Sequence, residues 1–419
     1  MPAPQSALSS VPIRVIRAIR GAAPAGGRAC RPQVPGVLAG LIGAALACAG
    51  FVDASAAERA APTRTSWPSF RNDPQQTGVA GSTLPEKLEL LWKRPAADGV
   101  TGACAIAGEH VYVPEVSGLV VCVERQSGQP VWSYRSVADP KAFAPGFKAA
   151  PTVTADTVYV GDEDGVLHAV ERATGRQKWT FATMGEIAGS AAVVGEHVVF
   201  GSHDSFLYCL KAAGGELVWK LQTDDRINCS TGVSDGHTFV TGCDGRLRVI
   251  DIDSGRQKSN IELSTYIIAS PALVGEMLYV GDHSGAFTAI NWRDGRVAWT
   301  HKDERSEFPF HASAAVTDQR VVVGSHDKNV YCLDRADGEV LWRFPTRARV
   351  SSSAAIVGER VLVGSDDGHV YELSLADGRE RWKFKAGRKV SAGMAVGEGV
   401  LVFGTDESNG MVYCFGARE

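Results

Sequence analysis

Basic, acidic and aromatic side chains recur at one point of a repeated pattern in this chain. The aligned segments EIAGS, RINCS, YIIAS, PFHAS, RVSSS and KVSAG, with FKAA one repeat earlier, vary most in their first and third positions. Arginine and lysine at such positions can pair with carboxylates or phosphates. The pattern predicts a binding site for an anionic small ligand or a partner protein, unless its cations pair with neighbouring carboxylates. The residues assigned to it are Lys148, Glu186, Arg226, Tyr266, His311, Arg349 and Lys389.

These segments follow predicted strands that contain a tryptophan and return about every 40 residues. A fixed period of this length is typical of a repeat architecture. Ser259 stands at the equivalent place in one repeat that lacks the indole. The tryptophans of the pattern are Trp92, Trp132, Trp179, Trp219, Trp299, Trp342 and Trp382.

Each repeat contains four short predicted strands separated by turns rich in glycine and aspartate. In residues 150–181 the strands are APTVTA, DTVYVG, VLHAVE and QKWTF. Four antiparallel strands on this period make one blade of a β-propeller. The last repeat supplies three strands and no tryptophan, while the segment LELLWKRP around Trp92 supplies a strand with nothing before it. We therefore predict an all-β, eight-bladed β-propeller over residues 87–419, closed by the N-terminal tryptophan strand pairing with the C-terminal three strands.

Two segments precede the predicted ring. Residues 1–56 combine five arginines, an apolar run from Val37 to Val52 and a small-residue cleavage site, as in a secretory signal peptide. An N-terminal membrane anchor is an alternative, although the run is shorter than the roughly 20 residues that span a bilayer; lipidation at Cys48 is another. Residues 57–86 form a polar lead segment that Trp67 and Phe70 could pin across the ring. We expect an exported protein that is periplasmic or otherwise extracytoplasmic.

Composition limits the partners and the metal chemistry. The formal net charge is −4, and removal of residues 1–56 would make it more negative, which does not favour nucleic acid or an anionic membrane surface. No CxxC motif is present, so neither a zinc nor a redox motif is visible. We expect a monomer without a metal site. One repeat position has cysteine in some blades and alanine or valine in others, which is typical of a packed interior position. We therefore predict interior thiols at Cys122, Cys209, Cys332 and Cys414.

Several motifs resemble the PQQ-like (pyrroloquinoline-quinone-like) β-propeller repeat family. They are the opening Trp-Pro-Ser-Phe-Arg (Trp67 to Arg71), the strand Leu-Leu-Trp-Lys (Leu90 to Lys93) and the repeated Gly-x-x-x-Trp, and the resemblance covers about residues 66–419. The family includes quinoprotein alcohol dehydrogenases and the outer-membrane assembly lipoprotein BamB. The resemblance implies that the tryptophans are structural and dock neighbouring blades, where an indole N–H can reach a backbone carbonyl.

Two classes of function remain. In the first, the protein is an exported non-enzymatic scaffold that binds a partner or a small ligand at its channel mouth, as in BamB-like envelope or outer-membrane assembly. In the alternative, the mouth holds PQQ with calcium, and the protein is a PQQ-dependent alcohol dehydrogenase. Dehydrogenases of the family are longer and carry an adjacent-cysteine disulfide beside the cofactor, and this sequence has no adjacent cysteines. The sequence therefore favours the scaffold, with no catalytic residue and no cofactor.

Overall fold

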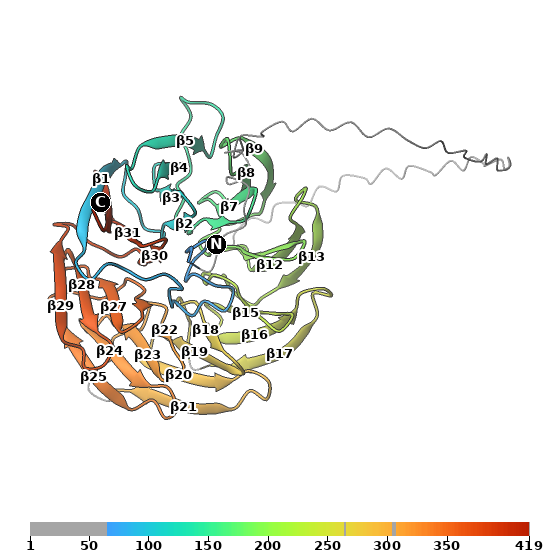
Figure 1. Cartoon of the computed structure of the whole chain (residues 1–419). Helices are drawn as coiled ribbons and strands as arrows, with labels where there is room; N and C mark the ends of the chain where they lie inside the picture. Colours follow the sequence, from blue (N-terminus) through green and yellow to red (C-terminus); the bar gives the residue numbers. More distant parts are fainter. Residues whose placement is uncertain (1–64, 264, 304–306, 419) are drawn as a thin grey trace, which may run out of the picture. The chain divides into compact units, whose positions relative to one another are not determined.

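The structure, a computed structural model, describes residues 65–263, 265–303 and 307–418. This part of the chain forms eight four-stranded antiparallel sheets arranged in a ring (Figure 1). The predicted all-β, eight-bladed propeller is confirmed. The predicted signal peptide, residues 1–56, and residues 57–64 of the lead segment lie outside the described residues. In the described ranges, no helix is long and apolar enough to cross a membrane.

The strands keep one order in each blade, and we number the blades 1 to 8 along the chain. The innermost strands, which line the central channel, are β2 (Ala105–Ala107), β6 (Thr152–Val153), β10 (Ala192–Val194), β14 (Gly232–Ser234), β18 (Ala272–Val274), β22 (Ala315–Val316), β26 (Ala355–Val357) and β30 (Ala395–Gly397). The second strands are β3 (His110–Glu115), β7 (Thr157–Gly161), β11 (His197–Gly201), β15 (His237–Thr241), β19 (Met277–Gly281), β23 (Arg320–Gly324), β27 (Arg360–Gly364) and β31 (Val400–Gly404).

The outer half of each blade consists of a third strand and a rim strand. The third strands are β4 (Leu119–Glu124), β8 (Val166–Glu171), β12 (Phe206–Lys211), β16 (Arg246–Asp251), β20 (Ala286–Asn291), β24 (Asn329–Asp334), β28 (His369–Ser374) and β32 (Gly410–Gly416). The rim strands are β5 (Pro130–Arg135), β9 (Gln177–Ala182), β13 (Leu217–Gln222), β17 (Gln257–Glu262), β21 (Val297–Lys302), β25 (Val340–Pro345), β29 (Glu380–Lys385) and, for blade 8, β1 (Glu89–Ala96).

Blade 8 combines the two ends of the propeller sequence. Its strand order is β1-β32-β31-β30, so the first strand pairs with the last. Trp92 lies opposite Cys414 in this antiparallel pair, and Ala96 lies opposite Gly410. The tryptophan strand is therefore a hydrogen-bonded part of the sheet that the final repeat leaves incomplete.

Indole groups link six of the eight pairs of neighbouring blades through N–H groups that donate to backbone carbonyls across the interface, and the Trp382 ring instead packs on Phe415 of blade 8, with centroids 5.3 Å apart. At Gly255, whose φ is +67°, a Cβ would lie 2.6 Å from the Trp219 ring, so the indole rests directly on the turn of the next blade. The donor and acceptor pairs, 2.7–3.1 Å apart, are Trp92 with Arg125, Trp132 with Arg172, Trp179 with Ala212, Trp219 with Ile252, Trp299 with Arg335, and Trp342 with Leu375.

The interface between blades 4 and 5 lacks the repeated tryptophan and is filled by a different residue. Ser259 replaces the indole donor, and Trp292 stands on blade 5 at the position that supplies the acceptor carbonyl elsewhere. The Trp292 side chain is buried, and its ring centroid lies 5.0 Å from that of Phe239 in blade 4. An indole therefore fills this interface from the opposite blade.

The four cysteines at the shared repeat position are free and buried, which confirms the predicted interior thiols at Cys122, Cys209, Cys332 and Cys414. Burial raises the pKa of the Cys209 thiol to about 12. These thiols are therefore protonated and pack as small apolar groups.

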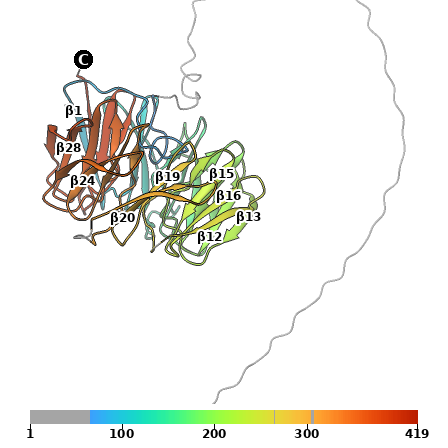
Figure 2. The ribbon, with the colours of Figure 1, turned by 90° about the horizontal axis from the view of Figure 1, so that it is seen from below.

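The described part of the lead segment, residues 65–86, lies inside the ring, drawn in blue at its centre in Figure 1 and toward one face in Figure 2. Trp67 is fully buried and forms a two-way backbone bridge with Ile106 of β2. Carbonyl groups of the lead segment also accept backbone N–H groups from other blades. The donor and acceptor pairs are Val153 with Pro68, Val233 with Pro74, Leu273 with Gln75, Val316 with Thr77, Ile356 with Gly78, and Glu398 with Thr65.

Arg71 fastens this segment to blades 6 and 7 from within. Its guanidinium donates to the carbonyl oxygens of Ala314, at 2.6 Å, and of Ala354. The side chain is 1% exposed, and burial lowers its pKa to about 9. The lead segment is therefore an integral plug of the channel, anchored by a buried cation as well as by its backbone.

Candidate functional site

The predicted site residues lie in the loops that lead from a rim strand to the next innermost strand. In each loop, a backbone carbonyl accepts the N–H of a residue at the tip of the hairpin between the second and third strands. Examples are Glu186 with His203, Arg226 with Cys243, Tyr266 with His283, Arg349 with Asp366, and Lys389 with Asp406. This repeated bond places the variable side chains beside the hairpin tips around one end of the channel, which we call the mouth.

Lys148 belongs to an acidic group on the side of blades 2 and 3. Its Nζ lies 2.5 Å from Glu163 and 3.5 Å from Glu186. Although burial opposes the shift, the hydrogen bond with Glu163 and the charge of Glu186 raise the pKa of Lys148. Glu186 also lies 3.6 Å from His203, whose other ring nitrogen donates to Asn228 Oδ1 at 2.6 Å. Two carboxylates therefore already compensate this cation.

An aromatic row occupies the mouth at blades 5 and 6. The Tyr266 and His283 rings stack with centroids 4.0 Å apart, and His283 Nδ1 shares a hydrogen bond of 3.0 Å with His311 Nε2. The His311 ring lies 4.5 Å from that of His326. Burial, followed by the neighbouring His326, His283 and Arg349, lowers the pKa of His311 to about 4. The His311 side chain in this row is therefore uncharged near neutral pH.

Arg349 and Lys389 lie on the following blades, where their charges act on a shared set of neighbours. Lys389 Nζ forms an ion pair with Asp406 at 2.9 Å. Burial raises the pKa of the Asp366 carboxyl, and the charges of Lys389 and Arg349 oppose that shift. Arg226, in contrast, is largely exposed, with Asp225 3.9 Å away. The structure thus places all seven predicted residues in mouth loops, and it pairs Lys148 and Lys389 with carboxylates.

Inside the mouth, a small polar cavity of about 140 Å³ lies on the channel axis. Serines of neighbouring blades connect its wall, because the backbone N–H of one donates to the hydroxyl of the next: Ser190 to Ser230, Ser230 to Ser270, Ser270 to Ser313, and Ser313 to Ser353, at 2.8–3.0 Å. Phe70 of the lead segment belongs to the same wall. The cavity has room for about four to five water molecules at roughly 30 Å³ each.

Four large apolar side chains on the described mouth loops are exposed but were not assigned to the site from the sequence, and the least exposed of them is Ile268, at 38%. Phe143 is 83% exposed, Met184 is 92% exposed and Phe308 is 56% exposed. Each lies between a rim strand and the next innermost strand. The signal in the sequence is a large apolar residue in an otherwise polar loop.

Metal ligands do not gather within the described ranges, where no group of three or more His, Cys, Asp or Glu side chains is placed to hold an ion. Asp162, which stands in an acidic hairpin turn, accepts the Val166 N–H at 2.8 Å and contacts the buried His168 at 2.9 Å. Its oxygens therefore stabilise the turn and the interior of blade 2.

Comparison with known proteins identifies the repeat. The family model described as "Outer membrane protein assembly factor BamB" matches residues 85–226, 203–315 and 304–413. The chain belongs to the BamB family. The outer membrane protein assembly factor BamB of Alkalilimnicola ehrlichii is 26% identical over 126 residues, which are 27% of this chain and 32% of that protein. The chain thus matches only about a third of the length of this BamB relative.

Solved structures share the propeller fold with this BamB family member. BamB from Moraxella catarrhalis superposes with a TM-score of 0.66 at 19% identity, covering 80% of this chain and 98% of that one. Quinohemoprotein alcohol dehydrogenase from Comamonas testosteroni gives a TM-score of 0.73 at 14% identity, covering 88% and 83% respectively. Because one fold here is shared by an assembly factor and a dehydrogenase, the likeness establishes architecture alone.

Proposed function

We propose that this protein is an exported, non-enzymatic BamB-like scaffold of the cell envelope, and that its mouth binds a partner protein. Membership of the BamB family supports an assembly role. The export signal expected in residues 1–56 supports an extracytoplasmic location. In this proposal the loops around the mouth supply the contact surface, and the rigid blades hold them in place.

The exposed apolar side chains of the mouth carry the proposal. Phe143 and Met184 extend into solvent from loops of neighbouring blades, and a few large side chains that become buried on binding supply most of the binding energy of a protein interface. The Arg226 side chain is more exposed than those of Lys148 and Lys389, and in this proposal it provides a charged rim contact for an acidic segment of the partner.

The geometry favours this proposal over a PQQ-dependent dehydrogenase. PQQ is a tricyclic tricarboxylate, whereas the axial cavity measures about 140 Å³. Two of the predicted basic side chains, Lys148 and Lys389, already pair with carboxylates. A spectrophotometric titration with PQQ and calcium, followed by a dye-linked alcohol assay, tests the alternative directly. Saturable binding accompanied by turnover would replace the scaffold proposal.

Affinity capture from the native envelope fraction tests the partner site. We expect wild-type protein to retain a defined set of envelope proteins, and Phe143→Ser/Met184→Ser to lose most of that set. The matched control is Val297→Ser/Leu341→Ser, which removes two exposed apolar groups from the rim strands instead. Equal capture by wild type and the mouth variant, with both folded, would exclude the mouth as the contact surface.

A further inference from the structure

Blade 3 lacks a contact that most innermost strands make with the lead segment. At the middle of this strand, six blades donate a backbone N–H to residues 67–78, from Ile106, Val153, Val233, Leu273, Val316 and Ile356. The equivalent Val396 of blade 8 also has no such acceptor among the described residues, but it is fully buried and its neighbour Glu398 donates to Thr65. Val193 is the equivalent residue of blade 3. Within the described residues, its N–H meets no such carbonyl.

The register shows that this N–H points away from its own sheet. Val193 pairs with Val198 as Val153 pairs with Val158 in blade 2. In blade 2 the N–H of that residue leaves the ladder and reaches Pro68 at 2.8 Å. The same antiparallel register therefore leaves the Val193 N–H on the free edge of β10.

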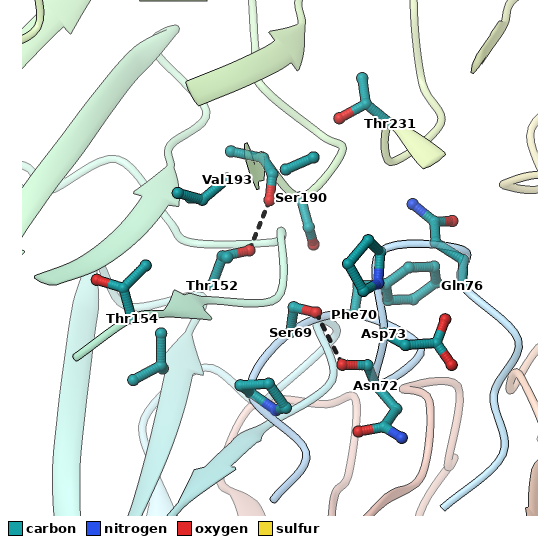
Figure 3. A pocket seen from close by; sticks show the side chains of 15 residues that line it. Ser69, Phe70, Asn72, Asp73, Gln76, Thr152, Thr154, Ser190, Val193 and Thr231 are labelled. Atoms are coloured by element: carbon teal, nitrogen blue, oxygen red, sulfur yellow. Dashed lines mark hydrogen bonds between the residues drawn. The ribbon is translucent and has the colours of Figure 1, made fainter. Parts of the chain in front are cut away.

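A pocket of about 160 Å³ occupies the place where the missing carbonyl would lie. Figure 3 shows Phe70, Asp73 and Gln76 of the lead segment on one side of it and Val193 on the other. All three residues of β10 are only half-buried, whereas the other innermost strands are mostly or fully buried. The lead segment thus leaves the wall of the channel at blade 3.

The pocket also contains an unsatisfied acceptor. The Gln76 side chain is 4% exposed, and its Oε1 is buried without a hydrogen-bond partner among the described residues. A buried acceptor without a donor is costly. The pocket therefore offers one free backbone donor, at Val193, which is the complement of a peptide carbonyl, and the buried, unsatisfied acceptor of Gln76 lies at its wall.

We infer that this pocket binds one extended peptide segment of a partner protein, which adds a strand to the edge of β10 and inserts a single apolar side chain. The lead segment shows that these edges accept an added backbone, since single carbonyls of it meet the equivalent N–H groups of other blades and isolated β-bridges form at Ile106 and Ile356. In this binding mode, main-chain hydrogen bonds provide affinity and a side-chain pocket provides specificity. A volume near 150 Å³ accommodates about one benzene ring.

The chemistry of the wall further restricts the inserted side chain. The Asp73 carboxylate borders the pocket, and it accepts the Thr77 N–H at 3.0 Å. Phe70 and Val193 form apolar parts of the same wall. An acidic side chain would bring a second carboxylate toward Asp73, so the pocket selects an uncharged, apolar residue. This site lies beyond the mouth and does not depend on the partner proposed there.

Amide hydrogen exchange of the free protein is the first test. We expect the Val193 amide to exchange at least 10-fold faster than those of Val153, Val233 and Leu273, which are bonded to the lead segment. Equal protection of Val193 would show that its N–H already has a partner, and would overturn the inference.

Binding of a defined probe is the second test. We expect the terminally blocked peptide acetyl-Thr-Val-Phe-Val-Thr-amide to bind the full propeller and to slow exchange at Val193. The same peptide with aspartate in place of phenylalanine should bind at least 10-fold more weakly. Absence of binding by the phenylalanine peptide, or equal binding of both peptides, would overturn the inference.

Two substitutions at one position separate the backbone from the side chain. Val193→Pro removes the N–H at an edge where the sheet does not use it, and should weaken peptide binding at least 10-fold. Val193→Ala retains the N–H and should change affinity by about 3-fold or less. Unfolding curves establish whether both variants fold. If Val193→Pro does not fold, Gln76→Leu provides an independent test, because it removes the acceptor instead of the donor. Undiminished binding by a folded Val193→Pro or Gln76→Leu variant would contradict the assigned edge.

Discussion

At its plugged end, the channel contains the lead segment, whose carbonyls meet the same backbone position in six of the eight blades. At the mouth, side chains that differ from blade to blade form local groups, such as Lys148 with two glutamates and His311 between two other histidines. The plug therefore consists of buried, repeated interactions, whereas the mouth consists of partly exposed, individual ones. We therefore expect the plug to contribute more to the free energy of unfolding than the mouth, and the side chains of the mouth to be free to vary with the partner that they bind.

Removing the Trp67 indole should give the largest loss of stability. The side chain is fully buried between the plug and blades 1 and 8, and truncation of a buried aromatic residue costs about 3–5 kcal/mol. We expect Trp67→Ala to lower the urea midpoint accordingly. Phe143→Ala, at the mouth, is the matched control and should change stability by about 0.5 kcal/mol or less. An unchanged midpoint in Trp67→Ala would mean that the plug contributes little.

A glycine pair measures the packing of the plug more finely. Gly78 has a φ of +66°, and a Cβ there would meet the Arg71 guanidinium, whereas Gly236 has a φ of +72° and open space around it. Both substitutions by alanine incur the backbone strain of about 1–2 kcal/mol, but only Gly78→Ala also displaces Arg71. We expect Gly78→Ala to be at least about 1 kcal/mol more destabilising than Gly236→Ala in chemical denaturation. Equal losses would show that Arg71 adapts without cost.

The sequence predicted the features that repeat and missed those that occur once. The tryptophan period and the incomplete final repeat sufficed for eight blades, because every blade must solve the same packing problem. The sequence predicted that Trp67 and Phe70 could pin residues 57–86 across the ring, and Trp67 is fully buried there. It did not predict the route of residues 65–86, since most of their contacts with the blades are backbone bonds that carry no residue signature. Pairing of Lys389 with Asp406 was left open, because the alignment fixes neighbouring loops but not side-chain directions. The role of Trp292 was not predicted, because this residue lies outside the repeated tryptophan position, where this blade pair has Ser259.

The histidine row should make the mouth sensitive to acid. Burial and neighbouring cationic groups lower the pKa of His311 to about 4 in the folded protein, compared with about 6.5 for an unfolded chain. Between these values the unfolded state binds more protons, so stability should fall as the pH is lowered from about 6.5 to about 4. We expect His311→Asn to show a flatter decline in urea midpoints over this range. The matched control is His197→Asn, on the hairpin next to β10. An equal decline in wild type and His311→Asn would contradict the assignment.

The smallest effect is expected at a charge pair of the mouth. Lys389 and Asp406 lie 2.9 Å apart, but both side chains are partly exposed, and solvent-exposed pairs contribute about 0–1 kcal/mol. Lys389→Ala should therefore lower stability by less than about 1 kcal/mol, and added salt should reduce the difference. A double-mutant cycle with Asp406→Asn isolates the pair from other effects of each substitution. A coupling energy comparable to the loss in Trp67→Ala would show that the mouth is as essential to the fold as the plug, and its side chains would then have little freedom to change with the partner.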